Sequence, residues 1–321
     1  MKNKFLIWTL KILSAVISFL LIFFFAQPFF IPKYLEDSTT IVKGYSYLEK
    51  DSIDVLFLGS SQMFCTVDSG KLSDEYGISS YDFGASGQTM SITPYYFDEA
   101  IKTQSPKLIM VEVCQIFATN KQISKQTLSW NYNPTDISTE KFFSLDSILS
   151  GDKIEAFKYT YAPLLLYHDR WSTLGDKNSK SKNDIDFVIH PEKYINFSSR
   201  GFLARDNVEP HKIAFYENDL TEKEIPEESK NAISYIAEQC KKNGIRLVFF
   251  KAPVSDWTKG DCNSVKSYMT ESGIEYIDLN ESLEIIGIDG NTDFYNIGHL
   301  NTSGAEKTTD YLATILPDYL K

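Results

Sequence analysis

The stretch "IDVLFLGSS", residues 53–61, joins a short apolar run to a polar glycine-serine turn. Two further stretches have the same form: "KLIMVEVCQ" (107–115) and "IRLVFFKAP" (245–253). Short, continuous apolar runs that end in polar turns are typical of strands buried on both faces, as in a parallel sheet. The three stretches therefore predict parallel strands at the centre of the fold.

Helical patterns alternate with these strands. They occupy "TPYYFDEAIKTQ" (93–104), "PEESKNAISYIAEQCKKNG" (226–244), in which Gly244 is placed as a C-cap, and "NSVKSYMTESG" (263–273), which leads into a fourth strand, "IEYIDL" (274–279). Such alternation predicts the α/β class, a doubly wound and mostly parallel sheet. Sites in these sheets lie outside the carboxyl ends of the strands, so we expect the turns "GSSQ", "VCQIF" and "KAPVSDW" to open on one face.

The region from about 119 to 224 interrupts this alternation and is interpreted as an insertion. It is rich in Asn, Ser, Asp, Lys and aromatic residues, with one clear helix-like piece at 152–174. The polar segment "GDKNSKSKNDID" (175–186) predicts a mobile loop. Two placements stay open for the insertion: over the site, as a lid or acceptor platform, or on a far edge of the sheet.

The run from Ile12 to Ile31 has twenty residues and no charge, which is long enough to cross a bilayer as a helix. A cleaved signal peptide is the alternative. The run is too long for a typical signal-peptide core, and no Ala-x-Ala site follows it, so we predict an uncleaved anchor. The expected organisation is a cytoplasmic stub and anchor (1–31), a linker (32–51) and one domain (52–321).

Charge places the domain outside the membrane and limits its partners. Lys2, Lys4 and Lys11 are the only charges before Lys33, so the positive-inside rule leaves the N-terminus cytoplasmic and the domain extracytoplasmic. Without these three, 29 of the 32 basic residues remain against 43 acidic ones. An excess of negative charge disfavours nucleic acid and anionic headgroups and suits a neutral or sugar-like substrate.

The spacing of the cysteines predicts neither a zinc site nor a disulfide-rich scaffold. Cys65, Cys114, Cys240 and Cys262 lie far apart, without a CxxC pair. Buried free thiols are one interpretation. Outside the membrane a disulfide is also allowed, and Cys240 with Cys262 is the pair that would form it.

Three short stretches carry candidate chemistry. In "LFLGSSQMF" (56–64) a serine follows a strand where a helix begins, which favours a nucleophile but also suits an N-cap or a phosphate loop. In "YDFGASGQTM" (81–90) Gly84 and Gly87 bracket a tight turn that lets the backbone approach a ligand. In "DFYNIGHLNTSGAEK" (293–307) a histidine lies just before the last helix.

This order of serine, glycine turn and histidine resembles the SGNH hydrolases, also called GDSL-like esterases. The resemblance runs from about Ser52 to Leu320, without the insertion. It implies that Ser61 is the nucleophile, with Ser60 in the place of the family's aspartate. It implies that His299 is the base, and that the N–H groups of Gly87 and Ser61 form the oxyanion hole.

The chain departs from the family pattern at two positions. No asparagine follows the strand that ends "VEVCQIF" (111–117), so Gln115 is the candidate for the missing amide. The family's aspartate lies three residues before the histidine, where this chain has Asn296, and Asp293 lies three further back. Three outcomes stay open: Asp293 orients His299, a Ser61–His299 dyad suffices, or the activity is lost.

The remaining histidines, His168, His190 and His211, lie in the insertion or at its exit. His168 is expected to pack on an amphipathic helix. No two of them have metal-ligand spacing, so we expect no metal, and no cofactor is expected.

Membrane-anchored proteins of this kind resemble those that move O-acetyl or D-alanyl groups onto cell-envelope polymers such as teichoic acid. The resemblance implies acyl transfer to an envelope glycan or polymer, with a membrane-bound acyltransferase as partner. Simple extracytoplasmic ester hydrolysis is one alternative. Another is a weak or inactive subunit that binds glycan through aromatic residues of the insertion: Trp130, Tyr132, Tyr159, Tyr161 and Trp171.

Overall fold

A computed structural model describes residues 2–33, 37–113, 115–172 and 181–321 of the chain. By its internal contacts the chain forms two units. The smaller comprises Met1–Lys33 with Ile137–Tyr194, and the larger comprises Tyr34–Asp136 with Ile195–Lys321. The division into anchor, linker and one domain stays a prediction, because the structure joins the N-terminal segment to part of the insertion.

A five-stranded sheet forms the centre of the larger unit. Its strands are β1 (Val55–Gly59), β2 (Ser80–Gly84), β3 (Leu108–Glu112), β4 (Arg246–Lys251) and β5 (Tyr276–Asp278). The order is β2-β1-β3-β4-β5 and every pairing is parallel. The predicted α/β class, with its mostly parallel sheet, is confirmed.

Continuous apolar sequence explains why these strands lie at the centre. In β1 the register pairs Phe57 with Met110 of β3, and both side chains are fully buried. Val248 of β4 is also fully buried. Burying such a side chain contributes on the order of 1.5–3 kcal/mol, so strands that are apolar on both faces favour the interior of the sheet.

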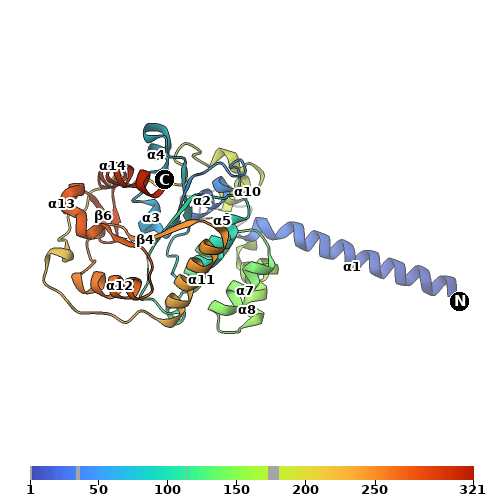
Figure 1. Ribbon diagram of the computed structural model, residues 1–321. Helices are drawn as coiled ribbons and strands as arrows, with labels where there is room; N and C mark the ends of the chain where they lie inside the picture. Colours follow the sequence, from blue (N-terminus) through green and yellow to red (C-terminus); the bar gives the residue numbers. More distant parts are fainter. Residues whose placement is uncertain (1, 34–36, 114, 173–180) are drawn as a thin grey trace. The chain divides into compact units, whose positions relative to one another are not determined.

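Helices connect the strands, and those expected at 93–104, 226–244 and 263–273 are present. The larger unit contains α3 (Ser61–Phe64), α4 (Ser69–Tyr76), α5 (Thr93–Ile101), α11 (Glu227–Asn243), α12 (Lys259–Glu271), α13 (Leu283–Ile286) and α14 (Thr302–Tyr319). α5 packs against α11, and α4 against α14 (Figure 1). α11 ends at Gly244, whose φ of 68° makes the expected left-handed cap.

One helix begins earlier than its apolar pattern suggests. α12 starts at Lys259 because Thr258 and Asp261 form a capping box, in which each side chain accepts a hydrogen bond from the other's backbone N–H. Two short strands, β6 (Phe294–Asn296) and β7 (His299–Leu300), then form an antiparallel pair before α14.

The segment expected as a linker is partly built into the larger unit. α2 (Ser38–Tyr45) packs against β2, and the buried ring of Tyr45 stacks on Phe83 with centroids 4.2 Å apart. The Tyr45 hydroxyl donates to the carbonyl of Ala100 at 3.1 Å. A buried tyrosine fixes this stretch in place, which periodicity in so short a segment did not reveal.

The smaller unit is helical. It contains α1 (Lys2–Phe30), α7 (Thr139–Ile148), α8 (Lys153–Tyr161), α9 (Pro163–Leu166) and α10 (Ser181–Ile189). The insertion therefore has more helix than the one piece expected. That piece is itself divided, because Pro163 cannot continue α8 and instead begins α9.

The rest of the insertion belongs to the larger unit and includes α6 (Lys125–Tyr132). Of the predicted mobile loop, residues 175–180 lie outside the described residues, and 181–186 open α10 rather than a loop. Short 3-10 turns complete the chain: η1 (Asn120–Gln122), η2 (His168–Ser172), η3 (Pro191–Lys193), η4 (Ala214–Tyr216) and η5 (Leu279–Ser282).

α1 is the single described helix long and apolar enough to cross a membrane. Its C-terminal end is bonded to the rest of the smaller unit. Gln27, only 1% exposed, donates to the carbonyl of Tyr161 at 3.3 Å and accepts from the N–H of Leu164 at 2.7 Å. Arg170 donates to the carbonyl of Phe30 at 2.8 Å.

Cys65, Cys240 and Cys262 are free and buried, as in the first of the two interpretations of the cysteines, and Cys240 and Cys262 form no disulfide in this structure. Burial raises the pKa of the Cys65 and Cys240 thiols to about 12, so both stay protonated at neutral pH. Cys114 lies outside the described residues.

Candidate active site

The candidate nucleophile lies where β1 meets α3. Ser60 is the N-cap of α3, and its hydroxyl accepts from the N–H of Gln62 at 3.3 Å. Ser61, half-buried, is the first residue of the helix. Its own N–H has no acceptor among the described residues. The side chain therefore stands beside backbone donors that favour negative charge.

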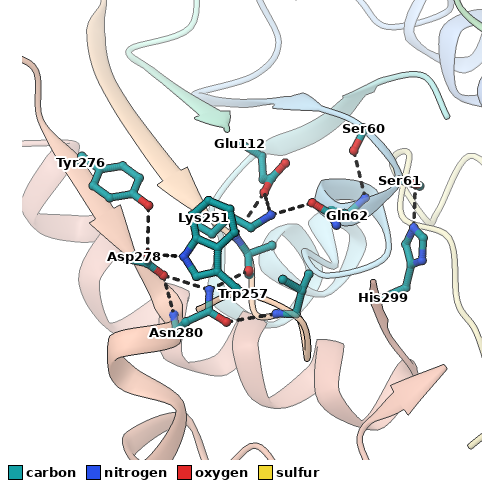
Figure 2. Close-up of polar contacts among 12 residues, drawn as sticks. Ser60, Ser61, Gln62, Glu112, Lys251, Trp257, Tyr276, Asp278, Asn280 and His299 are labelled. Atoms are coloured by element: carbon teal, nitrogen blue, oxygen red, sulfur yellow. Dashed lines mark hydrogen bonds and ion pairs between the residues drawn. The ribbon is translucent and has the colours of Figure 1, made fainter. Parts of the chain in front are cut away.

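His299 contacts Ser61 directly. The Ser61 hydroxyl and Nε2 of His299 are 2.7 Å apart, and a dashed line marks this contact in Figure 2. On the other side of the ring, Nδ1 lies 2.8 Å from Oδ1 of Asn296. The same Oδ1 accepts from the N–H of Gly298 at 3.0 Å, which turns the amide oxygen toward the ring. An imidazole that donates from Nδ1 leaves Nε2 free to accept the serine proton.

Asp293 is not part of this contact, which corrects the first of the three outcomes considered from the sequence. Its carboxylate is fully buried and accepts from Lys307 at 2.6 Å, from Ser303 at 3.0 Å and from the N–H of Asp289 at 2.8 Å. Burial opposes ionisation, but these donors hold the pKa of Asp293 below its usual value. Asp293 therefore fixes the start of α14 rather than the imidazole.

The electrostatic surroundings disfavour a charged imidazole. Burial, followed by the positive charges of Arg205 and Lys251, lowers the pKa of His299 from 6.5 to about 4. Asn296 can fix the tautomer, but it carries no charge to compensate an imidazolium. The ring is therefore neutral at physiological pH, and thus available as a proton acceptor but weakly basic.

Gly87 lies in the turn after β2 with a φ of 64°, a left-handed conformation that glycine adopts without strain. Its N–H has no acceptor among the described residues. Gly84 meets a different constraint, because a Cβ there would stand 1.8 Å from the carbonyl oxygen of Gly59. Gly84 therefore lets the end of β2 lie close to the end of β1, and Gly87 supplies the left-handed residue of the turn that follows.

A pocket of about 520 Å³ opens at the carboxyl ends of the strands. It is lined by residues from all three predicted turns, which confirms that they open on one face: Gln62, Gln115, Ile116, Phe117, Lys251, Val254, Asp256 and Trp257. Gly87 lines it as well. Part of the insertion also contributes, through Gln122, Ile123, Thr127 and Lys223.

A buried ion pair lies beside the pocket, and sequence reasoning missed it. Lys251, at the end of β4, donates to Glu112, at the end of β3, at 2.8 Å. The two side chains are 2% and 0% exposed. The Lys251 ammonium also lies 5.0 Å from the centre of the Trp257 ring, whose N–H donates to Asp278 at 2.8 Å.

A signal for this pair was present in the sequence. "MVEV" (110–113) and "FFKA" (249–252) each place one charge in an apolar strand. Buried charges are retained when they are paired, so adjacent parallel strands that each carry one buried charge of opposite sign predict a contact.

Among the described residues, no group of three or more His, Cys, Asp or Glu could hold a metal ion. His168 is exposed in η2 and bonds to the carbonyl of Leu165 at 2.9 Å, rather than packing on a helix as expected. His190 lies near Glu192, and His211 near Glu209.

No protein-family model matches the chain, and no curated protein matches it. Among solved structures, it is similar to a "putative acylhydrolase" from Bacteroides fragilis, with 12% sequence identity and a TM-score of 0.38. The match covers 90% of this chain and 100% of that chain. A likeness this distant carries no argument about function, which has to be inferred from the site itself.

Proposed function

We propose that the protein is a serine-dependent esterase or acyltransferase that acts on a small acyl ester. The single observation that carries this proposal is the 2.7 Å contact between the Ser61 hydroxyl and Nε2 of His299. A serine at a helix start, bonded to the acceptor nitrogen of a neutral imidazole, is the arrangement that nucleophilic catalysis requires.

The proposed reaction has two half-reactions. As the Ser61 oxygen attacks the acyl carbonyl, Nε2 of His299 takes the hydroxyl proton. The N–H groups of Ser61 and Gly87 stabilise the oxyanion. The imidazolium returns its proton to the leaving alcohol, and the acyl group stays on Ser61. Water or a second alcohol, activated by the same nitrogen, then releases it as an acid or a new ester.

Asn296 is the orienting residue in this proposal. Its oxygen holds the Nδ1–H tautomer, which is the part of a third catalytic residue's role that an amide can perform. The charge-compensating part is missing, and the lowered pKa of His299 is consistent with that. We therefore expect slow turnover of unactivated esters.

The substrate and location belong to the same proposal. With α1 as an uncleaved anchor and the N-terminus cytoplasmic, the site faces the outside of the membrane, where an envelope glycan or polymer is the acceptor. A membrane-bound acyltransferase that delivers the acyl group is then a natural partner. The bonds of Gln27 to Tyr161 and Leu164 support an uncleaved α1, because cleavage near this position would leave the smaller unit without them.

The test is turnover of a soluble acetyl ester by the full chain in detergent. Ser61→Ala and His299→Ala should each lower kcat by at least about 10³-fold, since they remove the nucleophile and the base. Ser60→Ala, next in the chain, should keep most of the rate because it loses only an N-cap bond. Wild-type turnover by both Ser61→Ala and His299→Ala would refute the proposal.

One rival receives specific support. Asn296 and the weakly basic His299 also suit a subunit that has kept the fold but binds glycan without catalysing a reaction. The aromatic surface expected for such a subunit is only partly present: Tyr132 and Tyr159 are in the core, whereas Trp171 contacts Phe30 but is 58% exposed. Absence of turnover in the wild-type protein, with glycan binding retained, would favour this rival.

A further inference from the structure

Gln62 follows the nucleophile in the chain and lines the pocket together with Gly87. Its amide has a defined orientation. Oε1 lies 2.6 Å from the ammonium of Lys251. An ammonium can donate hydrogen bonds but cannot accept them, so the amide oxygen must face Lys251 and the NH₂ group must point the other way.

Glu112 holds Lys251 in place. The buried carboxylate accepts from the ammonium at 2.8 Å, and Figure 2 shows the same nitrogen in contact with both Glu112 and Gln62. With Lys251 2% exposed and Glu112 fully buried, neither can turn to solvent without a large cost. The pair is therefore a fixed donor that locks one rotamer of the Gln62 amide.

The outward NH₂ group lies near the turn that carries His299. Nε2 of Gln62 is 3.5 Å from the position that a Cβ on Gly298 would take, in the turn that carries His299. It has no acceptor among the described residues. A polar donor beside Ser61, oriented by a buried ion pair and left without an acceptor, is placed for a group that arrives with the substrate.

We propose that the side-chain NH₂ of Gln62 is the third oxyanion donor of this site, oriented by Lys251 and Glu112. It supplies the amide that the sequence lacks after β3, in place of Gln115. Gln115 lines the same pocket, but it is exposed and no described contact orients its side chain. Gln62 is then a catalytic residue, whereas Lys251 and Glu112 are positioning residues.

This inference rests on the proposed function and is tested with Gln62→Glu in the full chain. Glutamate keeps the size of the side chain and its bond to Lys251, but it replaces the donor NH₂ with a negative acceptor. We expect kcat for a soluble acetyl ester to fall by about 10²–10³-fold, which is the loss seen when one oxyanion-hole donor is removed from another serine hydrolase. KM should change by less than about threefold, because the donor acts in the transition state.

Gln122→Glu is the matched control. It adds the same charge to the rim of the same pocket and retains Oε1, which accepts from Thr119 at 2.7 Å. Its kcat should stay within about threefold of wild type. A second variant, Lys251→Met with Glu112→Met, removes the buried pair without leaving a lone charge. It should lower kcat less than Gln62→Glu does, because it frees the amide but does not delete it.

Three results would overturn the inference: a kcat of Gln62→Glu within threefold of wild type, a loss of rate on Gln115→Glu instead, or a raised KM at unchanged kcat. The last would make Gln62 a substrate-binding residue. Failure of the proposed function looks different, because Ser61→Ala would then turn over the ester as fast as wild type.

Discussion

Asn296 Oδ1 lies 2.8 Å from Nδ1 of His299, in the place where a carboxylate would compensate the imidazolium. Asp293, three residues before Asn296 in the chain, is instead bonded to Lys307 at 2.6 Å. The two residues therefore have separable roles: the amide orients the base, and the carboxylate holds the turn before α14.

Asn296→Ala should lower kcat/KM about tenfold, because it removes one neutral hydrogen bond worth on the order of 1 kcal/mol and frees the ring. Asp293→Asn should leave kcat/KM of the folded protein within about threefold. It should lower the free energy of unfolding, because the buried partner of Lys307 loses its charge. Ester turnover and urea unfolding measure the two effects. Loss of rate in Asp293→Asn at unchanged stability would return the orienting role to the aspartate.

The pH dependence of kcat/KM reports the base of the free enzyme. Because the pKa of His299 is lowered to about 4, the imidazole is neutral above that pH, and activity should persist to about pH 5 and fall below pH 4. Circular dichroism over the same range separates titration from acid unfolding. If kcat/KM of the wild type instead fell with an apparent pKa near 6.5, the lowered pKa of His299 would be contradicted.

Asn296→Asp adds the missing carboxylate beside Nδ1. An adjacent negative charge favours the imidazolium, so the acid limb of kcat/KM should move upward by roughly one to three pH units. At pH 8 the rate should rise about tenfold or more, since the loss of such a carboxylate in another enzyme costs about 10⁴-fold. An unchanged pH profile in a folded Asn296→Asp protein would show that the side chain does not face the ring.

The buried pair of Lys251 and Glu112 leads to a prediction about the free energy of unfolding that does not depend on catalysis. Lys251→Met leaves a buried carboxylate unpaired and should cost about 3–5 kcal/mol of the free energy of unfolding. The double change Lys251→Met with Glu112→Met should recover most of that loss, because no lone charge remains. Urea unfolding of the full chain in detergent checks this. Equal stability of the single and double variants would mean that the pair is not buried as described.

If α1 is an uncleaved anchor, the protein isolated from membranes keeps its original N-terminus. Gln27→Ala should leave it in the membrane fraction but loosen the smaller unit, which limited proteolysis detects as faster cleavage between 137 and 194. Protease added outside intact cells should remove the larger unit. A mature protein that begins near residue 27 and appears in the medium would show a signal peptide instead.

The fold was predictable where one short stretch carries the whole signal. Apolar runs such as 53–61 are long enough to specify a strand, and the glycine at 244 specifies a helix end. The resemblance of the serine, glycine-turn and histidine stretches to a known hydrolase family singled out Ser61, Gly87 and His299 as candidates. Outside the piece expected at 152–174, the helical content of 137–194 was missed, because its helices are short and their apolar residues pack within the smaller unit.

The details of the site depended on contacts that spacing cannot specify. Asp293 and Asn296 lie six and three residues before the histidine, and the β6–β7 turn decides between them by directing the Asn296 oxygen at both Gly298 and His299. Gln62 looks like an ordinary helix residue until Lys251, 189 positions away, orients its amide. Such long-range partners are visible in a sequence only as single charges in apolar strands.

The most direct test of the central claim is covalent labelling of Ser61 by a fluorophosphonate, which reacts with activated serines and not with ordinary ones. We predict that the wild-type chain is labelled on the peptide that contains Ser61, identified by mass spectrometry. His299→Ala should slow labelling by at least about 10²-fold, whereas His211→Ala should not, since the His211 ring lies beside Glu209 and has no described contact with Ser61. No labelling of folded wild-type protein, or equal labelling of His299→Ala, would contradict the proposal that His299 activates Ser61.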